Sequence, residues 1–273
     1  MSELRLIEQK VKGKNHGVIT RLYSPGDLGN RLKPFVFLDF ISGEISESFG
    51  FKIHAHSGIA TLTYQLDVDV AYIDTEGTEG VLKAKGVEWM QAGGGAWHQG
   101  TLLNGGKVTG FQLWLALPEG IEDGPSYSQY VAPDEVPEAN GVKVLLGEYQ
   151  GLKSPINAPY SINYFDVSLK NGDIFKYDIP STHQVAWAFV YAGSAEVNHQ
   201  ESFQEVIVFS KSGEAVEFSA TTDCRILVGS AEEHPYPLIT GYGSVHTNSD
   251  SLRKSEQKIA AIGQRLKQEG KLD

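Results

Sequence analysis

Residues 17–41 have the sequence GVITRLYSPGDLGNRLKPFVFLDFI. β-Branched and other apolar side chains predominate over 17–23, and a second run, apolar apart from Asp39, fills 34–41. Between the two runs lies Ser24-Pro25-Gly26-Asp27, whose composition is typical of a tight turn. Short runs of this kind, bounded by Pro and Gly, are the pattern of β strands joined by turns. The stretch therefore predicts two consecutive strands and indicates a fold built from β structure.

The same pattern continues along most of the chain. Further strands are expected at 51–66 (one long strand or two joined by a bend), 70–73, 81–85 and 109–117, with a hairpin turn at 74–77. A polar, proline-bearing stretch at 118–140 has no clear period and is the candidate linker. After it, strands are expected at 142–146, 161–169, 186–191, 205–209, 215–218 and 224–228. No long helical pattern separates these strands, so the sequence predicts an all-β fold of two similar sandwich or barrel units in tandem.

The C-terminal residues have a different pattern. Ser249-Asp250-Ser251 offers side chains that can cap a helix N-terminus. Apolar residues then recur at helical spacing on one side, and basic residues cover the other side. The apolar ones are Leu252, Ile259, Ile262 and Leu266. We expect an amphipathic helix docked on the β structure; the alternative is a basic helix at a membrane surface, for which the apolar stripe is thin.

The composition excludes several classes of protein. Hydrophobic residues make up 41% of the 273, enough for a packed core, so a disordered chain is excluded. The formal net charge of −11 makes nucleic acid an unfavourable partner. Cys224 is the single cysteine, so an internal disulfide and a cysteine-based zinc site are both excluded. No signal-peptide core or ~20-residue apolar span is present, so we expect a cytoplasmic protein without a membrane partner.

Three of the eight histidines form a candidate metal site. His54 and His56 are two residues apart in an extended segment, which places both imidazoles on one face, about 7 Å apart along the strand. His98 follows Gly93-Gly94-Gly95-Ala96-Trp97, whose glycines allow a tight turn before the next strand. Three converging neutral imidazoles with open positions suit Zn²⁺, Fe²⁺, Cu²⁺ or Ni²⁺. The alternative is that His54 and His56 are hydrogen-bonded wall residues of a barrel and His98 is a turn residue.

The remaining histidines are interpreted as structural or surface residues, so the second β unit is expected to lack a metal site. They include His183, His199, His234 and His246. The large side chains around His98 are expected to pack in the core, with lining of a cavity as the alternative. These are Trp89, Met90, Trp97 and Trp114.

Three blocks of the sequence resemble the pirin family. They are His54-Ala55-His56-Ser57-Gly58 with the residues up to Tyr64, Trp89-Met90-Gln91-Ala92-Gly93 with the residues up to His98, and Gln112-Leu113-Trp114 with the residues up to Pro118. Pirin-like proteins carry, in the same order, His-Pro-His-Arg-Gly-Phe-Glu-Thr, Trp-Met-Thr-Ala-Gly ending in His-x-Glu, and Gln-Leu-Trp-x-x-Leu-Pro. Weaker similarity extends the resemblance over nearly the whole chain.

The resemblance implies a bicupin, with two jelly-roll β-sandwich barrels in tandem. The expected domains are 1–130 with the metal, 131–248 without one, and a helix at 249–273. In the family three His and one Glu hold the metal, most usually Fe, and the three His fall on His54, His56 and His98. The Glu does not survive, because Gly100 stands at its position, and Ala60 replaces a second family Glu.

Loss of the ligand carboxylate changes which metal the site is expected to hold. A carboxylate offsets part of the 2+ charge and suits Fe²⁺, so without it the affinity is expected to fall. Zn²⁺, Cu²⁺ or Ni²⁺ then become comparatively better, and Mn²⁺ is a further option. The alternative is a degenerate site that holds no metal.

The resemblance implies two functions of different classes. The first is a quercetin 2,3-dioxygenase-like oxygenase of a small enolic or aromatic substrate, with Ala60, Leu62 and Gln112 lining the pocket and no catalytic residue assigned. The second is a non-enzymatic protein that binds a regulatory protein partner or senses a small molecule. Other metal-dependent chemistry, such as isomerisation or hydrolysis of a small metabolite, is a third option. A monomer is the expected oligomeric state.

Overall fold

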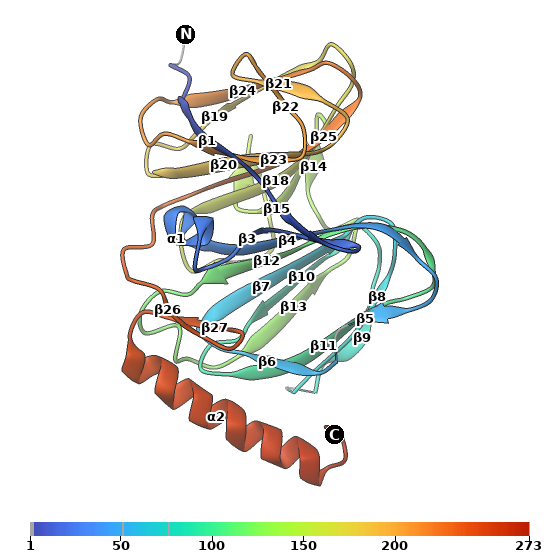
Figure 1. Ribbon diagram of the computed structural model, residues 1–273, viewed down its shortest axis with the longest axis vertical. Coiled ribbons are helices and arrows are strands. Elements are labelled where there is room, and N and C mark those ends of the chain that lie inside the picture. Colours follow the sequence, from blue (N-terminus) through green and yellow to red (C-terminus); the bar gives the residue numbers. More distant parts are fainter. Residues whose placement is uncertain (1–2, 51, 76, 273) are drawn as a thin grey trace. The chain divides into compact units, whose positions relative to one another are not determined.

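The computed structural model describes residues 3–50, 52–75 and 77–272, and the chain divides into two compact units (Figure 1). The first unit comprises Asn15–Glu135 and the residues from His234 onward. The second unit comprises the residues up to Lys14 and Val136–Glu233. Both units consist mainly of β sheets, which confirms the predicted all-β fold with two barrels and a C-terminal helix.

The first unit contains a seven-stranded sheet and a five-stranded sheet. In spatial order the seven-stranded sheet consists of β13 (Tyr127–Val131), β10 (Val87–Gln91), β7 (Ile59–Gln65), β12 (Gly106–Ala116), β4 (Phe35–Ile45), β3 (Ile19–Tyr23) and β2 (Lys14–His16). The five-stranded sheet consists of β5 (Phe49–Gly50), β11 (Ala96–Leu102), β8 (Val70–Asp74) and β9 (Glu79–Leu82), with β6 (His54–His56) paired to β11. The other elements are α1 (Leu28–Leu32), the paired strands β26 (Ile239–Gly241) and β27 (Ser244–His246), and α2 (Ser249–Gln268).

The second unit contains a seven-stranded and a four-stranded sheet. The larger sheet consists of β1 (Ile7–Lys12), β23 (Glu205–Phe209), β20 (Val185–Ala192), β25 (Cys224–Ala231), β18 (Ile162–Leu169), β15 (Val142–Leu146) and β14 (Glu138–Ala139). The smaller sheet consists of β19 (Ile174–Asp178), β24 (Ala215–Ala220), β21 (Ala195–Val197) and β22 (Gln200–Ser202). A further pair is formed by β16 (Glu148–Tyr149) and β17 (Leu152–Lys153).

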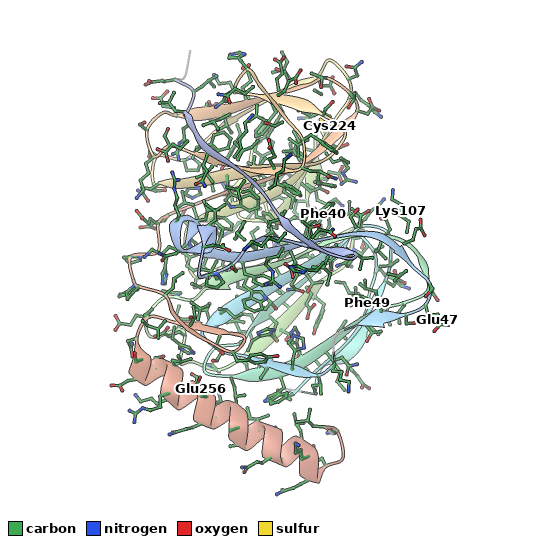
Figure 2. All side chains as sticks on the ribbon, in the orientation of Figure 1. Phe40, Glu47, Phe49, Lys107, Cys224 and Glu256 are labelled. Atoms are coloured by element: carbon green, nitrogen blue, oxygen red, sulfur yellow. The ribbon has the colours of Figure 1, made fainter. Side chains whose placement is uncertain are left out.

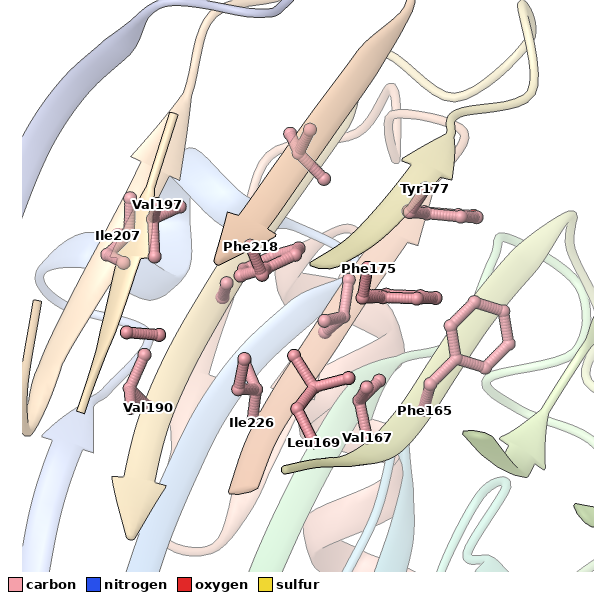
Figure 3. Packing of buried hydrophobic residues seen from close by; sticks show 14 of the residues in the cluster. Phe165, Val167, Leu169, Phe175, Tyr177, Val190, Val197, Ile207, Phe218 and Ile226 are labelled. Atoms are coloured by element: carbon pink, nitrogen blue, oxygen red, sulfur yellow. The ribbon is translucent and has the colours of Figure 1, made fainter. Parts of the chain in front are cut away.

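Apolar side chains from both sheets fill the interior of the second unit (Figure 3). Phe165 comes from the larger sheet, and Phe175 and Phe218 come from the smaller one. The single cysteine, Cys224, is buried in the same cluster (Figure 2). Alternation of side chains along each strand directs one apolar face of each sheet toward this core.

Domain boundaries differ from the expected ones at both ends of the chain. β1 pairs with β23 and belongs to the second unit, whereas the residues from His234 onward belong to the first unit. The physical reason is long-range strand pairing. β1 is the edge strand of a sheet whose other strands are formed by residues far away in sequence. Each unit therefore combines one long continuous stretch of the chain with a second segment that is distant in sequence. The second segment is the residues from His234 onward in the first unit and the residues up to Lys14 in the second.

The expected linker at 118–140 is also partly structured. Tyr127–Val131 forms β13, which pairs along its length with β10, Gln129 opposite Trp89. Pro125 and Pro133 flank this short strand, so the stretch resembles a proline-bearing linker in the sequence. Phe51 and Glu76, which belong to an expected strand and an expected turn, lie outside the described residues.

The predicted C-terminal helix is present as α2 and packs on the first unit. Its N-cap is Asn248, whose side-chain oxygen accepts a hydrogen bond from the Ser251 amide at 2.9 Å. The Trp97 indole donates to the carbonyl of Ile259 at 3.1 Å. Gly263 allows this approach, because a Cβ there would lie 2.9 Å from the Trp97 ring. Within the described chain, no helix combines the length and the apolar character needed to cross a membrane.

Candidate metal centre

The three predicted ligands lie on two paired strands of the first unit. β6 runs antiparallel to β11, with His98 directly opposite His54 and Ala96 opposite His56. Because His54 and His56 are two residues apart in a strand, all three imidazoles project from the same face. The ring centroids lie 4.8 Å apart for His54–His56, 4.7 Å for His54–His98 and 5.1 Å for His56–His98. One ligand nitrogen from each ring lies within 4.8 Å of the others.

The glycine-rich run before His98 brings β11 back against β6. Gly93 has φ +52°, and a Cβ on it would lie 2.4 Å from the carbonyl oxygen of Gly124. The carbonyl of Gly93 also accepts a hydrogen bond from the Gly58 amide at 2.7 Å, just beyond β6. Only a residue without a side chain fits this left-handed, closely packed turn. The sequence therefore forms the tight turn that the convergence of the histidines requires.

Hydrogen bonds define which ring nitrogens of the three histidines are available to coordinate a metal ion. Nδ1 of His54 lies 2.8 Å from the carbonyl oxygen of Lys52, and Nδ1 of His56 lies 2.8 Å from the carbonyl oxygen of Gly243. A carbonyl only accepts, so each Nδ1 carries the proton and each Nε2 carries the lone pair. In His98, Nε2 is buried without a hydrogen-bond partner among the described residues. An orphaned buried nitrogen of this kind fits a metal ligand.

Burial keeps two of the imidazoles neutral. It is the main cause that lowers the pKa of His54, and the nearby His98 lowers it further. Burial also holds the pKa of His56 well below its usual value, with His98 and His54 adding to the effect. Desolvation disfavours the charged imidazolium and so leaves the form that binds metals. The donor set therefore suits a divalent transition metal.

A cavity of about 590 Å³ adjoins the three histidines. Five polar residues on neighbouring strands of the seven-stranded sheet line one part of it in cross-strand register, and we call them the polar row. The polar row consists of Arg21, Asp39, Gln112, Thr63 and Glu88, in spatial order from β3 to β10. Within it, Arg21 forms an ion pair with Asp39, and the Thr63 hydroxyl donates to Gln112 Oε1 at 3.0 Å.

Aromatic side chains line another part of the cavity. Phe37 and Trp114 stack with centroids 4.1 Å apart and planes inclined by 12°. The Trp114 ring lies 4.9 Å from the His56 ring in an edge arrangement. The cavity therefore has aromatic side chains beside the histidines and hydrogen-bonding groups along the polar row.

The structure places the other predicted site residues as follows. Gln112 lines the cavity. Ala60 and Leu62 do not line it, which corrects that prediction; both are fully buried on the opposite face of β7. Alternation explains the difference, because Thr63 and Gln65 occupy the cavity-facing positions of this strand. Gly100 lines the cavity two residues after His98 and brings no carboxylate to it.

Spacing in the sequence left open whether the carboxylate of Glu88 approaches this centre. Glu88 on β10 is buried, lines the cavity, and has Oε1 3.7 Å from His98 Nδ1. Its ten-residue separation from His98 crosses the glycine turn, so spacing alone does not predict the approach. The available signal was an ionisable residue in a strand whose other residues carry no charge.

A second group of potential ligands holds the C-terminal segment in place. Glu122, Asp123 and His246 also bring ligand atoms within 4.8 Å of one another. Glu122 accepts hydrogen bonds from the amide and hydroxyl of Thr247 at 2.7 and 2.6 Å, and His246 contacts Ser57 Oγ at 2.9 Å. These internal partners satisfy the group, so its role is structural.

Comparisons with known proteins agree with this geometry. A sequence model of the family described as Pirin matches residues 18–115. A "Pirin-like protein" of Caulobacter vibrioides is 31% identical, over 82% of this chain and 85% of the relative. A Pseudomonas aeruginosa protein named "Putative quercetin 2,3-dioxygenase" is 29% identical, over 87% of this chain and 90% of the relative. The crystal structure of a quercetin 2,3-dioxygenase from Acinetobacter baumannii superposes with a TM-score of 0.86 at 23% identity, covering 94% of this chain and 97% of that one.

Fold and site together define a bicupin with a three-histidine centre in its first barrel. The chain belongs to the pirin family, because a pirin-like relative above 30% identity matches more than four-fifths of its length.

Proposed function

We propose that this protein is a metal-dependent oxygenase of a small enolic or aromatic substrate. His54, His56 and His98 would hold a divalent transition metal through Nε2. The convergence of three imidazoles on a cavity, with His98 Nε2 buried and unpartnered, carries the proposal. The name of the Pseudomonas aeruginosa relative supports the choice of oxygenase chemistry.

A divalent metal, when bound, supplies Lewis acidity that stabilises an oxygen anion of an enolic substrate. Phe37 and Trp114, which line the cavity, offer aromatic contacts to a substrate ring. Gln112 and Thr63, already bonded to each other, offer hydrogen-bonding groups to substrate hydroxyls. The cavity volume falls within the range of about 300–1,000 Å³ that is common for small-ligand sites.

The test combines elemental analysis with oxygen consumption. The purified protein, loaded separately with Fe²⁺, Mn²⁺, Ni²⁺, Cu²⁺ or Zn²⁺, is given quercetin as the probe substrate, and dissolved O₂ is followed. We expect turnover with at least one of these metals and none for His56→Ala, which loses a ligand. His199→Ala, an exposed histidine of the second unit, is the matched control. Stoichiometric metal without O₂ consumption under any loading would rule out oxygenase action on flavonols.

Gly100 favours a second candidate function, a non-enzymatic pirin that binds a regulatory protein partner. Without a ligand carboxylate at this position, the site holds a metal less strongly than the family's four-ligand centre. This candidate predicts that a partner binds wild type and His98→Ala with equal affinity and that no metal supports O₂ consumption. A loss of partner binding in His98→Ala would contradict metal-independent binding.

A further inference from the structure

Glu88 brings a buried carboxylate next to the three-histidine centre. It is 4% exposed and reaches the cavity from β10, across from the strands that carry the histidines. Its Oε1 lies 3.7 Å from His98 Nδ1. Among the described residues, Glu88 is not a member of the group whose ligand atoms lie within 4.8 Å of one another. The carboxylate therefore lies beside the centre rather than within the ligand set.

The contact involves Nδ1 of His98, the ring nitrogen other than Nε2, which has no hydrogen-bond partner among the described residues. In His54 and His56, Nδ1 is occupied by the carbonyl oxygens of Lys52 and Gly243. In His98, Glu88 lies beside Nδ1, and Nε2 is the nitrogen without a partner. Glu88 therefore takes, for His98, the place that a backbone carbonyl takes for each of the other two rings.

We propose that Glu88 is a positioning residue for the metal centre. It accepts a hydrogen bond from His98 Nδ1, which fixes the tautomer with the Nε2 lone pair toward the metal. It also supplies, from outside the ligand set, the negative charge that Gly100 does not supply within it. This inference rests on the proposed metal site.

A carboxylate in this position has a defined physical effect. Bonded to the outer nitrogen of a ligating imidazole, it raises the basicity of the inner nitrogen and restrains the ring. In a partly dry cavity it also offsets part of the 2+ charge, since low dielectric strengthens the attraction. Asp39 also lines the cavity, but its carboxylate already forms an ion pair with Arg21.

The space at Gly100 allows the missing charge to be restored. Gly100 follows His98 by two residues in β11, so a side chain there projects from the same face. A Cβ at Gly100 would contact only the Val70 side chain, at 3.6 Å, which is an ordinary van der Waals distance. Gly100→Glu therefore places a carboxylate at the family's ligand position without a backbone clash.

The experiment measures Co²⁺ binding to metal-free full-length protein by titration calorimetry and by the visible spectrum of the bound ion. We expect Glu88→Gln to bind one equivalent, as wild type does, with about 10–100-fold lower affinity and a shifted spectrum. The double variant Glu88→Gln with Gly100→Glu is expected to recover most of the affinity. Asp166→Asn, which neutralises a buried carboxylate of the second unit, is the matched control and should behave as wild type.

Several outcomes would overturn the inference. Glu88→Gln with wild-type affinity and spectrum would show that Glu88 does not act on the centre. Complete loss of Co²⁺, as in His98→Ala, would make Glu88 a direct ligand instead. Glu88→Asp keeps the charge and should lose less affinity than Glu88→Gln; the reverse order would also contradict the proposal. Absence of Co²⁺ binding by wild type would instead refute the proposed function itself.

Discussion

Each of the two barrel units contains a seven-stranded sheet and a smaller one, but the interiors of the two units differ. In the second unit, inward positions carry Phe165, Phe175 and Phe218, and the space between the sheets is filled (Figure 3). In the first unit, comparable strands carry the polar row and leave a cavity of about 590 Å³. The sheets alone do not determine whether the interior of a unit is a filled core or a cavity. The side chains at the inward positions decide it.

A buried histidine in each unit illustrates the difference. His183 of the second unit has Ser230 Oγ at 2.8 Å from Nδ1 and Ser161 Oγ at 2.8 Å from Nε2, so both ring nitrogens are satisfied. Burial, aided by Arg5, lowers its pKa to about 4. His98 of the first unit is similarly buried, and its Nε2 has no hydrogen-bond partner in the part of the chain that the structure describes. Saturated hydrogen bonding marks the structural histidine, and an orphaned nitrogen marks the candidate ligand.

The largest expected effect is loss of the metal. His98→Ala removes one of three ligands and should reduce bound metal from one equivalent to near zero. His183→Ala removes a buried histidine of the second unit and should leave the metal content unchanged. Elemental analysis of folded protein, purified without added metal, measures both. Equal metal loss in the two variants would contradict the assignment of the site to the first unit.

Truncating one phenylalanine in the core of the second unit and one at the cavity of the first unit compares a filled environment with a partly open one. Phe218→Ala should lower the free energy of unfolding by about 3–5 kcal/mol, because it leaves a void in a filled core. Phe49 (labelled in Figure 2) lines the cavity, and Phe49→Ala should cost less than about 2 kcal/mol, since its side chain is only partly buried. Chemical denaturation gives both values. Similar costs would mean that the cavity does not persist in solution.

The segments that complete the two units should respond differently to acid. In the first unit, hydrogen bonds from His246 and Thr247 lower the pKa of Glu122 against the opposing effect of burial. In the second unit, the Arg5 guanidinium donates to the carbonyls of His183 at 2.6 Å and Gln184 at 3.2 Å and stays charged throughout.

Because its folded pKa is depressed, Glu122 stabilises the fold above its unfolded pKa, and this contribution is lost as pH falls through the folded value. Glu122→Gln should therefore cost about 1.5–3 kcal/mol at pH 7 and progressively less as the pH falls below about 4. Denaturation of wild type and variant across this range measures the difference. A cost that is independent of pH would exclude the charged carboxylate as the source of stability.

The smallest effects come from adding one methyl group to each interior. A Cβ at Gly229 of the second unit would lie 2.4 Å from the Trp187 ring, so Gly229→Ala should cost about 1–3 kcal/mol. At Gly100 of the first unit there is room, so Gly100→Ala should stabilise slightly, by about 0.4–1 kcal/mol. Thermal midpoints of the two variants would show opposite shifts. A loss of stability in Gly100→Ala as large as that in Gly229→Ala would contradict the presence of free space beside Gly100.

Local patterns predicted most of the fold and part of the site. Alternation and turn residues identified the β architecture, and the two-residue spacing of His54 and His56 placed them on one face. The long-range partners were not predictable, since register depends on contacts between distant segments. The approach of Glu88 to His98 and the addition of β1 to the second unit are of this kind. Ala60 and Leu62 were assigned to the wrong face of their strand, which its polar residues Thr63 and Gln65 indicate in retrospect.

β1 belongs to the second unit, and the residues from His234 onward belong to the first. This arrangement has a consequence for synthesis on the ribosome. The carbonyl that orients His56 belongs to Gly243, 187 residues further along the chain, so this contact to the ligand pocket forms only after Gly243 has been synthesised. A gene fragment cut after codon 130 would express histidines without this brace. It would also carry β1 away from the barrel whose edge β1 covers.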